Sequence, residues 1–140
     1  MQNHCKLSDE EFINKFENCL LNPADFTHEA HLRLAWLYIQ DDGITKATEK
    51  LQDKLQAFVA YVGARNKYHT TLTIAAVMAV HHFVLRSKST NFKDFIAEFP
   101  QLNTHFKPLI ASHYSFDVFT STKARNSFIA PDKTPFDYNH

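Results

Sequence analysis

The chain has 140 residues, and its 15 basic and 15 acidic side chains cancel at pH 7 with histidine neutral. Balanced charge provides no positive field to attract nucleic acid or an anionic membrane surface, so both partners are disfavoured. The length fits one helical domain over residues 1–140. No apolar run approaches the roughly 18 residues of a membrane span, and no signal-peptide core is visible, so we expect a cytoplasmic protein.

Glycine content and apolar spacing together indicate the fold class. Two glycines in the whole chain argue against an all-β fold, which needs many tight turns. Apolar residues instead recur every three or four positions, which is helical periodicity. Thirteen Phe, five Tyr and one Trp supply a large apolar core. The sequence predicts an all-α fold with four main helices in a bundle, a smaller C-terminal helical segment and a packed tail.

The first two predicted helices are separated by Asn22-Pro23, which ends or interrupts the first of them. Ser8–Glu11 has the capping-box pattern that starts a helix, and an apolar stripe follows it. Thr27 can cap the next helix. We expect that helix to reach about Gln40 and to stop in the Asp-Asp-Gly segment 41–43.

Two further helices complete the predicted bundle. The third extends from Ile44 to near Gly63, because its apolar residues keep a spacing of three and four. The fourth spans about residues 69–86 and is apolar almost all round, which is typical of a central helix. Thr70 or Thr71 is placed to cap it.

Helical periodicity weakens after the fourth helix. Asn91 can cap a short helix that Pro100 stops. A second short helix is expected around residues 104–112, where Pro108 must lie in the first turn or at a kink. From Tyr114 onward we expect a tail that packs over the bundle as a loop with one helical turn.

Three histidines fall where helices should bury hydrocarbon. His28 and His31 have i, i+3 spacing and share one helix face, about 60° apart on the helical wheel. His69 shares its arc with the apolar residues of the fourth helix. A buried imidazole nitrogen without a partner costs about 1–3 kcal/mol. Three imidazoles from two segments therefore predict a metal site formed by these residues.

The predicted metal is zinc or iron. Three histidine ligands leave zinc one open position for water, as in catalytic zinc sites. Ferrous iron more often combines two histidines with a carboxylate, which Asp25 or Asp117 could supply. His113 is the next candidate ligand if the C-terminal part folds back. Residue types alone therefore leave the metal open.

Two other side chains are candidates for binding a cofactor or small ligand. Tyr38, with Trp36 and nearby Phe rings, is expected to line the histidine pocket. Arg125, from the aromatic-rich tail, could present its guanidinium to an anionic group. Arg33 lies on the polar arc of its helix and is expected to pair with an acidic neighbour. His4 is expected at the surface.

The two cysteines predict neither a disulfide framework nor a metal-type cysteine motif. Cys5 precedes the first helix, and Cys19 belongs to its apolar stripe. Neither is expected beside a basic group at a helix N-terminus, where a reactive thiolate would be stabilised. The sequence therefore predicts no nucleophile.

The order of short motifs resembles that of a group of small, uncharacterised bacterial helical proteins. The motifs are Phe-x-His-x-x-His-Leu-Arg-Leu-Ala-Trp at Phe26–Trp36, Lys-Tyr-His-x-Thr at Lys67–Thr71, and Pro131-Asp132. The resemblance implies that the three histidines in these motifs belong to one site. It implies no mechanism.

Two functions of different classes follow from these patterns. In the first, the protein is a helical metalloprotein with a buried histidine site, and the metal could activate water or dioxygen on a small substrate. In the alternative, it is a metal-free helical bundle that binds a small ligand or a protein partner through an aromatic groove. The histidines would then be hydrogen-bonded structural groups. The oligomeric state stays open.

Overall fold

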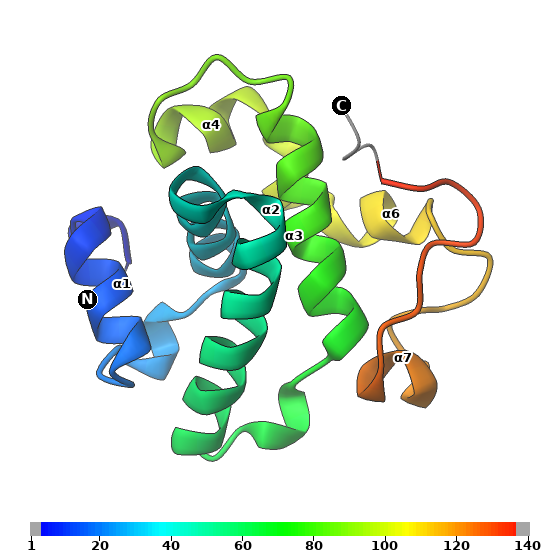
Figure 1. Cartoon of the computed structure of the whole chain (residues 1–140), viewed down its shortest axis with the longest axis horizontal. Helices are drawn as coiled ribbons and strands as arrows, with labels where there is room; N and C mark the ends of the chain where they lie inside the picture. The colour runs from blue at the N-terminus through cyan, green and yellow to red at the C-terminus, as the bar shows by residue number, and fades with distance from the viewer. Residues whose placement is uncertain (1–3, 137–140) are drawn as a thin grey trace.

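The structure is a computed structural model that describes residues 4–136, and the regular secondary structure of that part is helical (Figure 1). The predicted all-α class is confirmed. The helices are α1 (Asp9–Glu17), α2 (His28–Tyr61), α3 (Thr70–Val84), α4 (Phe92–Glu98), α5 (Gln101–Thr104), α6 (Phe106–Ala111) and α7 (Thr122–Asn126). Short 3-10 turns lie at η1 (His4–Lys6), η2 (Pro23–Asp25) and η3 (Arg65–Lys67).

Three helices begin at the caps that the sequence predicts. The Ser8 side chain accepts from the Glu11 backbone N–H at 3.1 Å, and the Glu11 carboxylate accepts from the Ser8 N–H at 3.0 Å. This is the predicted capping box. The side chains of Thr27 and Asn91 cap α2 and α4 in the same way.

Helix α2 consists of two helical halves that meet at Gly43, whose φ of 81° and ψ of 171° are not helical. The helix that starts at His28 was predicted to stop at residues 41–43, and helical geometry is indeed interrupted there, at Gly43. The chain changes direction at this point and continues directly into the second half of α2. The first half of α2 is seen end-on in Figure 1 and runs across α3, whereas the second half runs beside α3. The predicted bundle of four main helices is not confirmed, because the first half of α2 crosses α3 instead of running alongside it.

Replacing Gly43 by Ala should lower the free energy of unfolding by about 1–3 kcal/mol, because side-chain-bearing residues rarely adopt this backbone conformation. An added Cβ would have no atom within 4 Å, so the loss reports backbone strain alone. Urea unfolding followed by the fluorescence of Trp36 measures it. Exposed Glu49→Ala is the control, expected to change stability by less than about 0.5 kcal/mol. Equal stability of the two variants would contradict the kink.

The core is rich in aromatic rings and centres on α2 and α3. Phe16 of α1 is fully buried, and its ring centroid lies 5.2 Å from those of both Phe26 and Phe58. Phe26 and Phe58 also line the cavity described below. Helix α1 therefore supports one wall of that cavity from behind.

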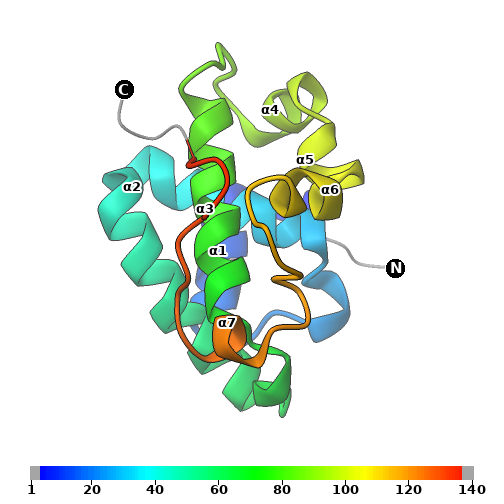
Figure 2. The same cartoon turned by 90° about the vertical axis from the view of Figure 1, so that its right-hand side faces the viewer.

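The C-terminal part folds back along α3 (Figure 2). Thr71 of α3 donates to the Ser127 carbonyl oxygen at 2.8 Å, and the His113 ring stacks on Phe136 with centroids 4.1 Å apart. The predicted packed tail with one helical turn, α7, is confirmed. Within residues 4–136, none of the helices combines the length and apolar character needed to cross a membrane.

Candidate functional site

The three predicted histidines line one cavity of about 420 Å³. Its walls come from both halves of α2, from η3, α3 and α6, and they are mostly apolar. Aromatic rings from Phe26, Phe58 and Phe106 contribute to them. Of the described residues that line the cavity, only Lys67 carries a full charge at neutral pH, and its side chain is exposed.

His69 caps α3, so the prediction that Thr70 or Thr71 would cap it is wrong. Its Nδ1 accepts from the Leu72 N–H at 3.1 Å. The proton of the neutral ring must therefore lie on Nε2, which donates to the Val118 carbonyl oxygen at 3.0 Å. Burial lowers the pKa of His69, which favours this neutral form. Both nitrogens have backbone partners, and neither lone pair is available to a metal in this arrangement.

His28 lies nearer the surface than its helical-wheel position indicates. Its side chain is exposed, its Nε2 donates to the Leu102 carbonyl oxygen at 3.1 Å, and its ring centroid lies 4.5 Å from that of Phe106. The wheel misplaces it because α2 begins at His28, where no preceding turn covers the side chain. His28 thus connects the start of α2 to the α5–α6 segment at the edge of the cavity.

His31 differs from the other two histidines because its Nε2 is buried and has no hydrogen-bond partner among the described residues. Its ring stacks on Phe26 with centroids 5.9 Å apart. Burial, followed by the nearby His28, lowers the pKa of His31 to about 4, so the ring is neutral at pH 7. An unpaired buried nitrogen costs about 1–3 kcal/mol. A partner supplied from the cavity would remove that cost.

Tyr68 adds a second unpaired polar atom to the cavity wall. Its hydroxyl is buried and has no hydrogen-bond partner of normal geometry, and the side chains of Thr73, Thr70 and Gln56 lie close enough to lower its pKa in part. Burial raises the pKa of Tyr68, so the phenol keeps its proton at neutral pH. The residues that line the cavity therefore include two neutral polar groups, on His31 and Tyr68, that have no hydrogen-bond partner of normal geometry.

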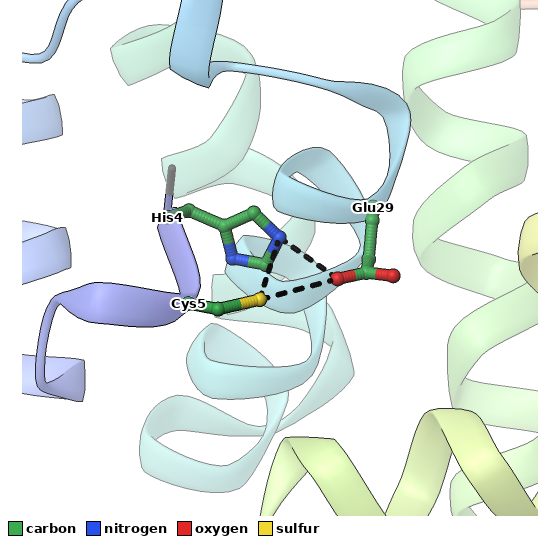
Figure 3. A group of neighbouring side chains, drawn as sticks. All are labelled: His4, Cys5 and Glu29. Carbon is green, nitrogen blue, oxygen red and sulfur yellow. Dashed lines mark hydrogen bonds and ion pairs between the residues drawn. The ribbon is translucent and has the colours of Figure 1, made fainter. Parts of the chain in front are cut away.

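A separate side-chain cluster lies between η1 and the first turn of α2 (Figure 3). Within residues 4–136, His4, Cys5 and Glu29 are the one group of three potential metal ligands whose ligand atoms all lie within 4.8 Å of one another. His4 Nε2 donates to Glu29 Oε1 at 3.0 Å. Cys5 Sγ lies 3.7 Å from His4 Nε2 and 3.6 Å from Glu29 Oε1.

Arg33 holds this N-terminal segment against α2. Its guanidinium donates to the carbonyl oxygens of His4 and Leu7 and, at 2.8 Å, to Asp9 Oδ1, and it lies 4.7 Å from the Phe12 ring centroid. The predicted pairing of Arg33 with an acidic residue is confirmed, although Arg33 is buried. The predicted exposure of His4 is wrong, because these contacts bury its ring.

The cluster does not have the arrangement of a Cys-His-Glu catalytic triad. Cys5 and Glu29 both approach Nε2 of His4, whereas a triad uses the two ring nitrogens for different partners. Burial and the charge of Glu29 raise the pKa of Cys5, so the thiol keeps its proton.

The two predicted ligand-binding side chains make contacts within the fold. Tyr38 is fully buried, is not among the residues lining the histidine cavity, and donates to Glu17 Oε2 at 2.7 Å. Arg125 donates to the carbonyl oxygens of Asn66 and Tyr68, at 2.8 and 3.2 Å. It also lines a second cavity of about 600 Å³ beside Tyr68. A cofactor-binding role for either residue stays a prediction.

Sequence reasoning identified His31 but missed Tyr68 and the cluster at His4, Cys5 and Glu29. Tyr68 lies inside the Lys-Tyr-His motif, which was a usable signal. The cluster joins residues about 25 positions apart, and no local pattern indicates such a contact. Comparisons of the chain with protein-family models, with curated proteins and with solved structures gave no match.

Proposed function

We propose that the protein binds a small, largely apolar molecule in the histidine-lined cavity and pairs one polar group of that molecule with His31. The observation that carries this proposal is that His31, whose buried Nε2 has no hydrogen-bond partner among the described residues, is one of the residues lining a cavity of about 420 Å³. Small-molecule sites are commonly cavities of roughly 300–1,000 Å³ with apolar walls and few polar groups.

The cavity wall restricts the chemistry of the ligand. The rings of Phe26, Phe58 and Phe106 suit an aromatic or aliphatic body. Neutral His31 and Tyr68 can each donate or accept one hydrogen bond, which suits a hydroxyl or carbonyl group on the ligand. Lys67 at the exposed side would attract an anionic end of the ligand, and none of the described lining residues is a carboxylate that would repel it.

Metal binding by His28, His31 and His69 is the second candidate function of the same cavity. It requires His69 to release both the α3 cap and the Val118 carbonyl oxygen, and His28 to release Leu102. Elemental analysis of protein purified without a histidine tag separates the two readings. Zinc or iron present at one equivalent, and lost in His31→Ala, would favour the metal reading.

Binding of 4-methylphenol and toluene tests the ligand proposal, because the two probes differ by one hydroxyl group. A hydrogen bond to a buried unpaired group contributes about 1–3 kcal/mol, so titration calorimetry should give roughly 5- to 150-fold tighter binding of 4-methylphenol. His31→Leu should remove this preference. The matched control is His81→Leu, because His81 also has a buried, unpaired nitrogen but is not among the residues lining this cavity. Absence of binding, or a preference that survives His31→Leu, contradicts the proposal.

His31→Leu should also stabilise the ligand-free protein by roughly 1–2 kcal/mol at pH 7, because an apolar side chain replaces an unpaired buried nitrogen. The pKa of His31 is about 4 in the folded protein, below the ordinary imidazole value of 6.5, so the unfolded chain binds more protons between these pH values. The free energy of unfolding of the wild type therefore decreases as the pH drops from 6.5 toward 4. The His31→Leu variant should lack the part of this decrease that comes from residue 31. Urea unfolding at pH 7 and pH 5 measures both effects. Lower stability of the variant at pH 7 would show that the nitrogen has a partner.

A further inference from the structure

We propose that His4, Cys5 and Glu29 form a zinc-binding site that is separate from the histidine-lined cavity. Figure 3 shows the His4 imidazole, the Cys5 thiol and one carboxylate oxygen of Glu29 converging on a common point. The ligands come from η1 and from the first turn of α2. The proposal is independent of the small-molecule function, because none of the three residues lines that cavity.

The distances between the ligand atoms fit a tetrahedral zinc ion. Zinc bonds of about 2.0–2.2 Å to nitrogen or oxygen and about 2.3 Å to sulfur place two tetrahedral ligands about 3.3–3.7 Å apart. The observed separations are 3.6 Å from Cys5 Sγ to Glu29 Oε1 and 3.7 Å from Cys5 Sγ to His4 Nε2. The separation of His4 Nε2 from Glu29 Oε1 is 3.0 Å, since these atoms share a hydrogen bond. That contact must open by about 0.4 Å when the metal replaces the proton.

The mixture of ligand atoms favours zinc over other common cations. Magnesium and calcium prefer oxygen ligands, and Cu(I) prefers sulfur, whereas zinc accepts nitrogen, sulfur and oxygen together. A thiolate from Cys5 and a carboxylate from Glu29 balance the two positive charges of the ion. On binding, the Cys5 thiol proton leaves to solvent, and the proton of the neutral His4 ring moves from Nε2 to Nδ1.

Neighbouring groups already orient the ligands. Glu29 Oε2 accepts from Asn103 Nδ2 at 3.0 Å, which leaves Oε1 directed toward His4 and Cys5. Arg33 donates to the His4 carbonyl oxygen, and its charge is balanced by Asp9 at 2.8 Å. Its contact of 3.3 Å with His4 Nδ1 must open when that nitrogen gains the proton, because two N–H donors would then face each other.

The cluster also has room for a fourth ligand. All three residues line a cavity of about 470 Å³ that extends to Asn91, Phe92 and Lys93. A water molecule in the remaining tetrahedral position would face this space. Three protein ligands with one exchangeable position is the pattern of catalytic rather than structural zinc sites.

Titration of the metal-free full-length protein with Zn²⁺ and with Co²⁺ tests the site. Calorimetry should give one zinc per chain, and Co²⁺ should produce the near-ultraviolet thiolate-to-cobalt absorption band. Cys5→Ser should abolish the band and weaken zinc binding at least about 10-fold, and Glu29→Gln should also weaken binding about 10-fold or more. Cys19→Ser is the matched control, since Cys19 is the other cysteine of the chain and lies outside the cluster.

Three results would overturn the proposal: no zinc binding, zinc binding unchanged in Cys5→Ser, or loss of the cobalt band in Cys19→Ser. Thermal melting of the metal-free variants checks that each is folded. The substitutions at residues 5 and 29 are nearly isosteric, so they should leave the fold of the metal-free protein unchanged. Zinc binding lost instead in His31→Ala would place the metal in the histidine-lined cavity. That outcome would reject the zinc site at His4, Cys5 and Glu29, whereas the proposed small-molecule function is tested separately by the binding of 4-methylphenol.

Discussion

Replacing Arg33 by Met should lower the free energy of unfolding by roughly 3–5 kcal/mol. The guanidinium is buried and donates to His4, Leu7 and Asp9 of the N-terminal segment. Hydrogen bonds from a charged group contribute about 1.5–3 kcal/mol each and do not add fully. Methionine keeps much of the apolar volume over Phe12 but leaves the two backbone oxygens without their donor.

Urea unfolding followed by Trp36 fluorescence measures the loss, and limited proteolysis within residues 4–27 reports whether the N-terminal segment detaches. The control is Arg65→Met, because Arg65 is exposed and should change stability by less than about 0.5 kcal/mol. Equal stability of the two variants would contradict the anchoring role of Arg33. Arg33→Lys should recover only part of the loss, since one ammonium cannot reproduce the planar fork of donors.

Replacing His69 by Ala should cost roughly 2–4 kcal/mol of unfolding free energy. The change removes the α3 cap, worth about 0.5–2 kcal/mol, and it leaves the buried Val118 carbonyl oxygen without its donor, at about 1–3 kcal/mol. His69→Asn should lie between the wild type and the alanine variant, because asparagine can cap a helix but is too short to keep the Val118 bond.

Urea unfolding of the wild type and the two His69 variants tests this order of stabilities. A lost Val118 bond should also increase amide hydrogen exchange in the tail around α7, which lies against α3 in Figure 2. Equal stability of His69→Asn and His69→Ala would show that the cap contributes little. Unchanged stability of His69→Ala would contradict both contacts.

His31 and His69 line the same cavity, yet their substitutions should have opposite effects on stability. Both nitrogens of His69 have backbone partners, so its loss removes stabilising contacts. Nε2 of His31 has none, so its loss removes a destabilising feature. A residue that destabilises the empty protein is the one expected to interact with a ligand, because the unmade hydrogen bond is then available for binding.

Local chemistry explains which parts of the fold could be predicted from the sequence. The caps at Ser8, Thr27 and Asn91 depend on atoms no more than three residues away, and all three are confirmed. The change of direction at Gly43 likewise follows from the short Asp-Asp-Gly segment. The cap by His69 was missed because histidine is not among the usual capping residues.

Contacts distant in sequence explain what could not be predicted at the site. The helical wheel brought His28 and His31 to one face, but the partner of His28 is Leu102, 74 residues away. The partner of His69 is Val118, 49 residues away. His4 was expected at the surface because no local pattern indicates its contact with Arg33, which is 29 residues away in the sequence. The position of the His31 and His69 rings beside one cavity could therefore be inferred, whereas the burial of His28 and His4 and the hydrogen-bond partners of the ring nitrogens could not.

Nitrogen-15 NMR of the histidine rings, recorded with and without 4-methylphenol, measures the interaction proposed for His31 most directly. Hydrogen bonding to the probe should shift the Nε2 resonance of His31 and leave the ring resonances of His81 unchanged, and the shift should saturate with the calorimetric affinity. Binding of 4-methylphenol without any change at His31 Nε2 would show that this nitrogen does not recognise the ligand.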